Sequence, residues 1–168
     1  IRNRFEVTGM IDVKVIKEAY QFDMMIKQLE NAKILGVDTE TTGLDPYTYH
    51  PLLISLYDGV TAFVIDLLAI DRKKIKQLKP ILESPDVLKV GHNLSYEWKF
   101  FYHLARIEMV HMHDVMLVDR MNFGGLKMQH TLKAVTLRLL DIDMDKTIRA
   151  SFIDADVSTI SFTDEQYY

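Results

Sequence analysis

The sequence predicts an α/β fold with a mixed five-stranded sheet, an antiparallel meander of three strands followed by parallel strands, and helices on both faces. Two apolar runs flank Asp58-Gly59, a pattern typical of an antiparallel hairpin. A third apolar run, at residues 34–37, precedes that hairpin and is too short and too β-branched to favour a helix. After residue 85, short apolar runs alternate with segments of helical period, as expected for parallel strands.

The composition fits one globular domain. The 168 residues are 48% hydrophobic and 26% charged, which allows a sizeable core. The net charge of −4 counts against a large basic nucleic-acid interface, but it allows an enzyme that holds a few nucleotides at an acidic centre. The chain has no cysteine, no apolar run of membrane-spanning length and no visible signal peptide. We therefore expect a cytoplasmic protein without a membrane partner.

The first part of the chain predicts an edge strand and a helix. Residues 1–10 are polar and irregular, so we expect an N-terminal arm there. Residues 11–17 alternate apolar and polar side chains, which suits an edge strand. The next apolar residues recur at the spacing of an amphipathic helix, namely Phe22, Met25, Ile26 and Leu29.

The middle of the chain predicts the meander and a basic helix. The three strands are expected at residues 34–40, 52–57 and 61–66. The helix follows from the spacing of Ile75, Leu78 and Leu82, and it carries Arg72, Lys73, Lys74, Lys76 and Lys79. Because no aromatic residue is interleaved to stack on a base, we interpret its charges as a solvated face rather than a DNA-binding stripe.

The second half alternates short strands and helices. Strands are expected at residues 87–91 and 107–110, and Asn93 opens the helix between them. We expect the buried face of that helix to consist of Trp98, Phe101, Tyr102 and Ala105. Further helices are expected over residues 115–121, around 132–139, over 146–152, and from Thr163 onward, where Gln166 completes a capping-box pattern.

The most informative stretch starts at Ile34 as an apolar strand and turns acidic at Asp38. Strand side chains alternate between faces, so Asp38 and Glu40 point the same way. Two neighbouring carboxylates repel each other, and a bound cation removes that repulsion. Oxygen-only ligands suit Mg²⁺ or Mn²⁺. A lone Asp-x-Glu after a strand is common and more often structural, so the longer string carries the argument.

That string, Asp-Thr-Glu-Thr-Thr-Gly-Leu-Asp at residues 38–45, resembles the first motif of the DEDD superfamily of 3′–5′ exonucleases. The superfamily includes the proofreading domains of family A DNA polymerases and the ribonuclease D group. The resemblance implies a ribonuclease H-like fold, and it extends from about Val13 to Tyr168.

A second string, Gly91-His92-Asn93-Leu94-Ser95-Tyr96-Glu97, follows a strand and opens a helix. Taken alone, it predicts helix capping, with Asn93 as the N-cap and Glu97 favoured by the helix dipole. It also resembles the second motif of the polymerase proofreading domains, in which the acid is normally aspartate. Glu97 is therefore a departure, and its longer side chain could weaken or shift the second metal ion.

The remaining similarities lie toward the end of the chain. His113-Asp114 resembles the helix-opening aspartate of the family, which is not a metal ligand, and His111 and His113 are too few ligands for a zinc site. The segment Asp143-Met144-Asp145-Lys146 resembles the ribonuclease D group. Residues 163–168 are similar to the lead-in to the third motif, which implies that the chain, as a domain over residues 11–168, ends before that motif is complete.

The resemblance implies two-metal hydrolysis of the 3′-terminal phosphodiester, with release of nucleoside 5′-monophosphates. Asp38, Glu40 and Glu97 would hold two divalent cations, Mg²⁺ or Mn²⁺. The catalytic tyrosine would fall just after Tyr168, or be Tyr168 if the register slips by one. The residues implied to bind the terminal nucleotides are Thr41, Leu44, His92, Asn93 and Tyr96.

Three functions remain open from the sequence. The first is a proofreading exonuclease domain that acts on single-stranded or frayed 3′ ends of DNA and works with a polymerase domain of the same or a companion polypeptide. The second is a ribonuclease D-like exoribonuclease, since RNA is a possible substrate. The third is a catalytically weak or inactive module that binds a DNA end or braces a polymerase, which Glu97 and the missing fourth carboxylate motivate.

Overall fold

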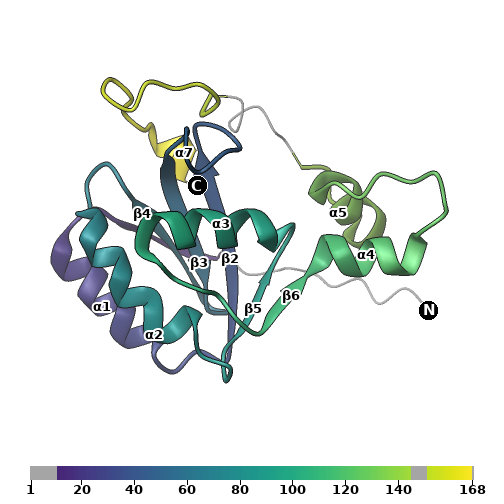
Figure 1. The fold of residues 1–168 in the computed structure, drawn as a ribbon, viewed down its shortest axis with the longest axis horizontal. Coiled ribbons are helices and arrows are strands. Elements are labelled where there is room, and N and C mark those ends of the chain that lie inside the picture. Colours follow the sequence, from purple (N-terminus) through teal and green to yellow (C-terminus); the bar gives the residue numbers. More distant parts are fainter. Residues whose placement is uncertain (1–10, 145–150, 168) are drawn as a thin grey trace.

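A six-stranded mixed sheet forms the centre of the protein in the computed structural model, which describes residues 11–144 and 151–167 (Figure 1). The expected arm at residues 1–10, most of the expected helix at 146–152, and Tyr168 lie outside these residues. The strand order is β1-β4-β3-β2-β5-β6. The strands are β1 (Asp12–Ile16), β2 (Ile34–Thr41), β3 (Pro51–Tyr57), β4 (Thr61–Asp66), β5 (Leu88–Gly91) and β6 (Met112–Asp114).

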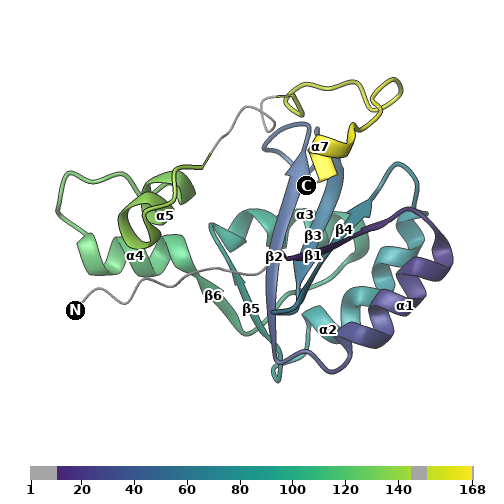
Figure 2. The same ribbon diagram turned by 180° about the vertical axis from the view of Figure 1, so that it is seen from behind.

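Four of the described helices lie on one face of the sheet, as Figures 1 and 2 show from opposite sides: α1 (Ala19–Leu29), the 3₁₀-helix η1 (Arg72–Leu78), α2 (Lys79–Leu82) and α3 (Leu94–Ala105). The other described helices are α4 (Val115–Phe123), α5 (Leu132–Leu140) and α7 (Asp164–Tyr167). The opposite face is partly covered by residues 151–167, which end in α7, and α4 and α5 project beyond the β6 edge. In the described part of the chain, no helix combines the length and apolarity that crossing a bilayer requires.

The predicted meander is confirmed. Strand β2 pairs antiparallel with β3, and β3 pairs antiparallel with β4. The Asp58 carboxylate closes the hairpin because Oδ1 accepts hydrogen bonds from the backbone N–H groups of Val60 and Thr61, at 2.9 and 2.7 Å. Gly59 has a φ of +97°, which favours glycine in this turn.

The predicted count of five strands is wrong by one, and the last strand is displaced. The edge strand expected at residues 11–17 is confirmed as β1, which pairs parallel with β4, so that the sheet has six strands in all. The last strand is Met112–Asp114 rather than residues 107–110. Strand β5 is only four residues long, and its last three residues pair with residues 112–114, so that residues 107–110 lie before the pairing begins. Ile107 and Met109 are buried in the core just before that strand.

The two faces of the sheet have separate apolar clusters. The larger cluster lies under α1, η1, α2 and α3 and includes Phe22, Leu35, Val37 and Phe101. The smaller cluster lies on the opposite face, where residues 151–167 pack on the sheet; its buried members are Leu52, Leu53, Val64, Phe152 and Tyr167. This second cluster positions the C-terminal segment over the face that carries the acidic side chains of β2.

The prediction for the buried face of α3 is half correct. Phe101 and Ala105 are buried as expected, together with Leu94, Glu97 and Phe100. Trp98 and Tyr102 are only partly buried, and their rings stack on each other with centroids 5.1 Å apart. These two aromatic residues therefore lie at the edge of the helix face, where they contribute to the surface.

Candidate active site

Two carboxylates of β2 lie on the same face of the sheet, as the alternation predicted. The side chains of Val37 and Thr39 are buried on the helix-covered face, while Asp38 and Glu40 are on the other. In the register with β3, Asp38 lies opposite Ser55, and Glu40 lies opposite Leu53. Ser55 and Leu53 line the same cavity as the two carboxylates.

This cavity has a volume of about 960 Å³ and is bounded by parts of the chain that are far apart in sequence. Strands β2, β3 and β4 form its floor, the start of α3 forms one side, and residues from α4 to α5 and from the C-terminal segment form the others. Seven of the nine site residues predicted from the sequence line it: Asp38, Glu40, Leu44, His92, Asn93, Tyr96 and Glu97.

Glu97 reaches the cavity from the first turn of α3 and is only 3% exposed. Asn93, just before this turn, has a φ of 65° in the left-handed region. Asn93 is the N-cap residue of α3, as predicted, but its side chain makes no capping hydrogen bond. A left-handed residue turns its side chain away from the N–H groups that an extended N-cap residue would reach.

Asp114 caps α3 instead. Its Oδ1 and Oδ2 accept hydrogen bonds from the backbone N–H groups of Asn93 and Leu94, both at 2.9 Å. The same carboxylate is the N-cap of α4, where Oδ1 accepts from the backbone N–H of Met116 at 2.9 Å. Asp114 thus begins a helix, as the sequence implied, and one side chain fixes the starts of two helices.

The loop after β2 presents Leu44 at the mouth of the cavity. Leu44 is 76% exposed, so it does not pack on the core as a simple turn residue would. The Tyr96 hydroxyl donates to the carbonyl oxygen of Gly43 at 2.9 Å and also contacts Thr41 Oγ1. Thr41 is buried, is not among the lining residues, and donates to the Gly43 carbonyl, so its side chain stabilises the loop.

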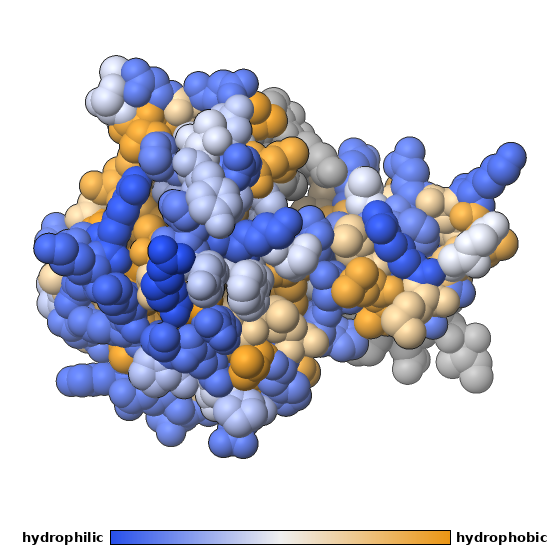
Figure 3. Space-filling model, in the orientation of Figure 1, coloured by the Kyte–Doolittle hydropathy of each residue, from blue (hydrophilic) through white to orange (hydrophobic). Residues whose placement is uncertain are grey.

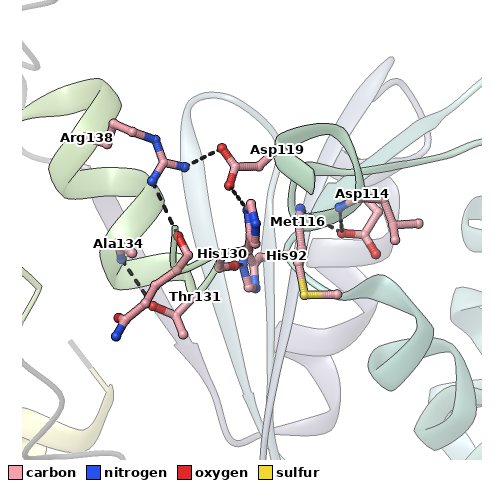
Figure 4. A network of polar contacts seen from close by, with 10 residues as sticks. His92, Asp114, Met116, Asp119, His130, Thr131, Ala134 and Arg138 are labelled. Carbon is pink, nitrogen blue, oxygen red and sulfur yellow. Dashed lines mark hydrogen bonds and ion pairs between the residues drawn. The ribbon is translucent and has the colours of Figure 1, made fainter. Parts of the chain in front are cut away.

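A polar network supports the opposite side of the cavity (Figure 4). The His92 Nε2 atom donates to the carbonyl oxygen of His130 at 2.8 Å, and His130 Nδ1 lies 2.6 Å from Asp119 Oδ2. The Arg138 guanidinium contacts the second oxygen of Asp119. The hydrogen bond from Arg138, with a further one from His130, lowers the pKa of Asp119 below its usual value. This network ties α4, α5 and the second sequence string together.

Several lining residues were not predicted from the sequence. Arg120 of α4 brings a positive charge to the cavity, and Glu165 of α7 brings a further carboxylate. Other unpredicted members come from the segment before α5 and from its first residue, namely Met128, Gln129, His130, Thr131 and Leu132. No motif marks the segment from α4 to α5, and only its mixture of polar and apolar residues was visible in the sequence.

Tyr167 lines the cavity, but its hydroxyl is already engaged. It donates to Asp66 Oδ2 at 2.7 Å in a buried position. Burial, followed by the bond to the Asp66 carboxylate, raises the pKa of Tyr167 above its usual value, because the phenolate would be desolvated beside a negative charge. Tyr167 therefore anchors α7 to the sheet. Tyr168, the predicted catalytic tyrosine, lies outside the described residues.

The chemistry of the lining carboxylates suits a hard divalent cation. Asp38, Glu40 and Glu97 offer only oxygen atoms, which is the donor type that Mg²⁺ and Mn²⁺ prefer. Within residues 11–144 and 151–167, no three His, Cys, Asp or Glu side chains lie close enough together to form a ready-made metal site. The three carboxylates thus share one cavity and fit such a cation in donor type.

Comparison with known protein families gives one match that covers most of the chain. A family model described as 3′–5′ exonuclease matches residues 13–163. Among curated proteins, DNA polymerase I of Pseudomonas aeruginosa is 32% identical over 101 residues, which cover 54% of this chain and 11% of that protein. DNA polymerase I of Aquifex aeolicus is 31% identical over 126 residues, which cover 75% of this chain and 20% of that protein. The chain thus corresponds to a small part of these relatives.

Solved structures share the fold at lower sequence identity. The EXO domain of Aedes aegypti Nibbler superposes with a TM-score of 0.78 at 16% identity, covering 95% of this chain and 82% of that chain. Escherichia coli RNase D, described as an exoribonuclease involved in structured RNA processing, superposes with a TM-score of 0.75 at 20% identity, covering 93% and 40%. At such identities the likeness confirms the α/β fold expected from the sequence.

Proposed function

Because the chain belongs to the 3′–5′ exonuclease family, we propose that it removes nucleotides one at a time from the 3′ end of DNA, as the proofreading domain of a polymerase. One observation carries the proposal. Asp38 and Glu40 from β2 and Glu97 from α3 line a single cavity, with the exposed side chain of Leu44 at its mouth. An acidic pocket beside a projecting apolar residue suits a phosphodiester that reacts at a cation centre while a base is held outside the stack.

DNA is the substrate that the sequence relatives favour. Both curated relatives are named DNA polymerase I, and each is more than 30% identical to this chain in the matched region. A single-stranded or frayed end is the expected form of the substrate, because the strand must leave the duplex for its terminal nucleotide to enter the cavity. The polymerase domain, in the same or a companion polypeptide, is the proposed partner.

The carboxylates are proposed to hold two divalent cations, Mg²⁺ or Mn²⁺. When bound, such a pair supplies Lewis-acid assistance to the attacking water and to the leaving 3′ oxygen. Asp38 and Glu40 are suited to the role because they lie two residues apart on one strand face. Glu97 is suited because it is buried and reaches the cavity from the first turn of α3. The products would be nucleoside 5′-monophosphates.

Other lining residues are proposed to place the terminal nucleotides. Leu44 would wedge against the last base, and His92, Asn93 and Tyr96 would line the path of the strand. Thr41, which the sequence placed beside the terminal nucleotide, would act through the loop, because its side chain bonds to the Gly43 carbonyl. Polar side chains that are already hydrogen-bonded to the fold require little reordering when a substrate binds.

Two further residues complete the proposal. Arg120 is suited to a phosphate contact, since its guanidinium carries a fixed positive charge at the cavity. Tyr168 is proposed to orient the attacking water. Its neighbour Tyr167 is a poor candidate for this role, because the Tyr167 hydroxyl is committed to Asp66.

A ribonuclease D-like activity is the second candidate, and one observation favours it. Met144, in the segment that resembles the ribonuclease D group, lines the same cavity as the carboxylates. The nature of the sugar accepted by the cavity therefore distinguishes the two functions, because only RNA presents a 2′-hydroxyl.

Nucleotide release from matched oligonucleotides tests the proposed function. We expect the protein, supplied with Mg²⁺ or Mn²⁺, to shorten a 5′-labelled single-stranded DNA from its 3′ end faster than a blunt duplex and faster than RNA of the same sequence. Addition of a chelator should stop the reaction. Faster trimming of RNA would replace the proposal with the ribonuclease D-like function, and no release from any substrate with either metal would overturn both.

Glu97→Asp tests whether the longer acid at this position limits the rate. Aspartate is shorter by one methylene and is the residue of the family's second motif, so we expect nucleotide release to rise by about two- to tenfold if metal geometry is limiting. Steady-state rates at saturating Mn²⁺ and Mg²⁺ measure the effect. The same substitution at exposed Glu108 serves as the control. An unchanged or lower rate would show that the site is adapted to glutamate.

A further inference from the structure

A second groove, of about 450 Å³, lies between the loop after β2 and the outer side of α3. It adjoins the active-site cavity, because Leu44 lines both. The loop contributes Asp45, Pro46 and Tyr47, and α3 contributes Trp98, Lys99, Tyr102 and His103. A strand whose 3′ end occupies the cavity would therefore pass Leu44 and meet this groove next.

Aromatic rings are the main feature of this groove. Tyr47 is 83% exposed, and its ring meets His103 edge to face with centroids 5.1 Å apart. Trp98 and Tyr102 stack with an interplanar angle of 5°. Exposed and half-exposed rings that are already held in place by one another provide flat surfaces for nucleobases at a low entropic cost.

Cationic side chains accompany the rings. Lys99 is exposed and lines the groove, and the Arg106 guanidinium lies 5.0 Å from the centroid of the Tyr102 ring. Beyond Arg106, the Lys79 ammonium donates to the Arg106 carbonyl at 3.0 Å, which brings the basic segment of η1 and α2 beside the end of α3. Figure 3 shows the face of the molecule on which α3 lies, and hydrophilic side chains predominate there over the sheet and its helices.

Within the described residues, the basic helix touches the groove region at one point only. Its charges alone predicted a solvated face, because no aromatic residue is interleaved among them. The fold brings one of those charges, Lys79, to the end of α3, where its ammonium also pairs with Glu83, whereas Lys74 pairs with Asp23 of α1. Asp45 is the acidic member of the groove, and its carboxylate accepts hydrogen bonds from the Tyr47 N–H and the Thr48 hydroxyl within the loop.

We propose that this groove binds the single-stranded nucleic acid that leads to the 3′ end, stacking its bases on the rings of Tyr47 and Trp98 and pairing its phosphates with Lys99 and Arg106. The inference rests on the proposed function, because it assigns a path to the strand whose end reacts in the cavity. It predicts that nucleotides several positions from the scissile bond contribute to affinity.

Trp98 makes the test specific, since it is the single tryptophan of the chain. Binding of oligo-dT of three and of twelve nucleotides is measured in EDTA, to prevent hydrolysis, by Trp98 fluorescence and by anisotropy of a 5′ label. We expect the 12-mer to bind more tightly and to quench Trp98, while the 3-mer, held within the cavity, leaves the fluorescence nearly unchanged.

Tyr47→Ala removes one stacking surface from an exposed loop position. It should weaken 12-mer binding by about fivefold or more and change 3-mer binding by less than about twofold. Lys99→Ser should reduce the salt dependence of 12-mer binding by about one phosphate contact. Tyr20→Ala on α1 is the matched control and should have no effect, because the Tyr20 side chain is 63% exposed and does not line the groove.

Each other outcome has a definite meaning. Equal affinity of the wild-type protein for the two lengths would contradict binding of the strand in the groove and leave the proposed function standing. An equal loss of affinity for both lengths in Tyr47→Ala would have the same meaning. Unchanged 12-mer affinity in Tyr47→Ala would do the same. Failure of the wild-type protein to bind either oligonucleotide in EDTA would overturn the inference, while nucleotide release with Mg²⁺ or Mn²⁺ tests the proposed function separately.

Discussion

Replacing Asp38 with asparagine is expected to slow nucleotide release by about a thousandfold or more, with little effect on stability. The substitution keeps the size of the side chain and removes its negative charge. Asp38 lies on the strand face that lines the cavity, next to Glu40, and it is proposed to hold a cation that assists the reaction. Loss of that charge would weaken binding of the cation on which the proposed reaction depends.

Two measurements separate this prediction from a general loss of folding. Mn²⁺ titration by calorimetry should show weaker binding in Asp38→Asn, while the thermal unfolding midpoint without metal should change by less than about 2 °C. Asp86→Asn, at an exposed loop position outside the cavity, is the control and should retain full activity. Activity close to that of the wild-type protein in Asp38→Asn would remove the basis of the proposed mechanism.

Asp114→Ala is expected to lower the free energy of unfolding by about 2–3 kcal/mol, which is a large effect for one side chain at a helix start. The Asp114 carboxylate accepts backbone hydrogen bonds from Asn93 and Leu94 at the start of α3, and from Met116 at the start of α4. Alanine would leave these N–H groups without their acceptor. Because Glu97 lies in the first turn of α3, nucleotide release should fall as well.

Denaturant unfolding measures the stability change, and a second capping residue provides the comparison. Asp71 caps η1 by accepting one hydrogen bond, from the backbone N–H of Lys73 at 2.9 Å. Asp71→Ala should therefore cost about 1 kcal/mol, clearly less than Asp114→Ala. Equal effects of the two substitutions would show that Asp114 does not link the two helix starts energetically.

Much of the candidate site could be predicted because its acidic residues lie in two short strings. The alternation of strand side chains placed Asp38 and Glu40 on one face, and the structure confirms it. The string around Glu97 follows a strand and opens a helix, as predicted. Asn93 is the N-cap residue as predicted, but the side chain that accepts the hydrogen bonds was missed, because Asp114 lies about 20 residues away in the sequence.

The aromatic residues of α3 show a different limit. Helical spacing grouped Trp98 and Tyr102 with Phe101 and Ala105 as one buried face. The spacing describes a stripe on the helix, whereas the extent of burial depends on how far the neighbouring elements cover that stripe. In the fold, the loop that carries Tyr47 borders Trp98 and Tyr102 across a groove and leaves them partly exposed.

The sequence by itself determined the α/β class, the meander and the two acidic strings, because each depends on the periodicity or turn chemistry of a few neighbouring residues. Only the tertiary structure decided the parallel edge pairing of β1 with β4 and the capping of two helices by Asp114. The same holds for the polar network of Asp119, His130 and Arg138 between α4 and α5. These features join residues that are distant along the chain. Their partners become definite only when packing of the core brings the elements together.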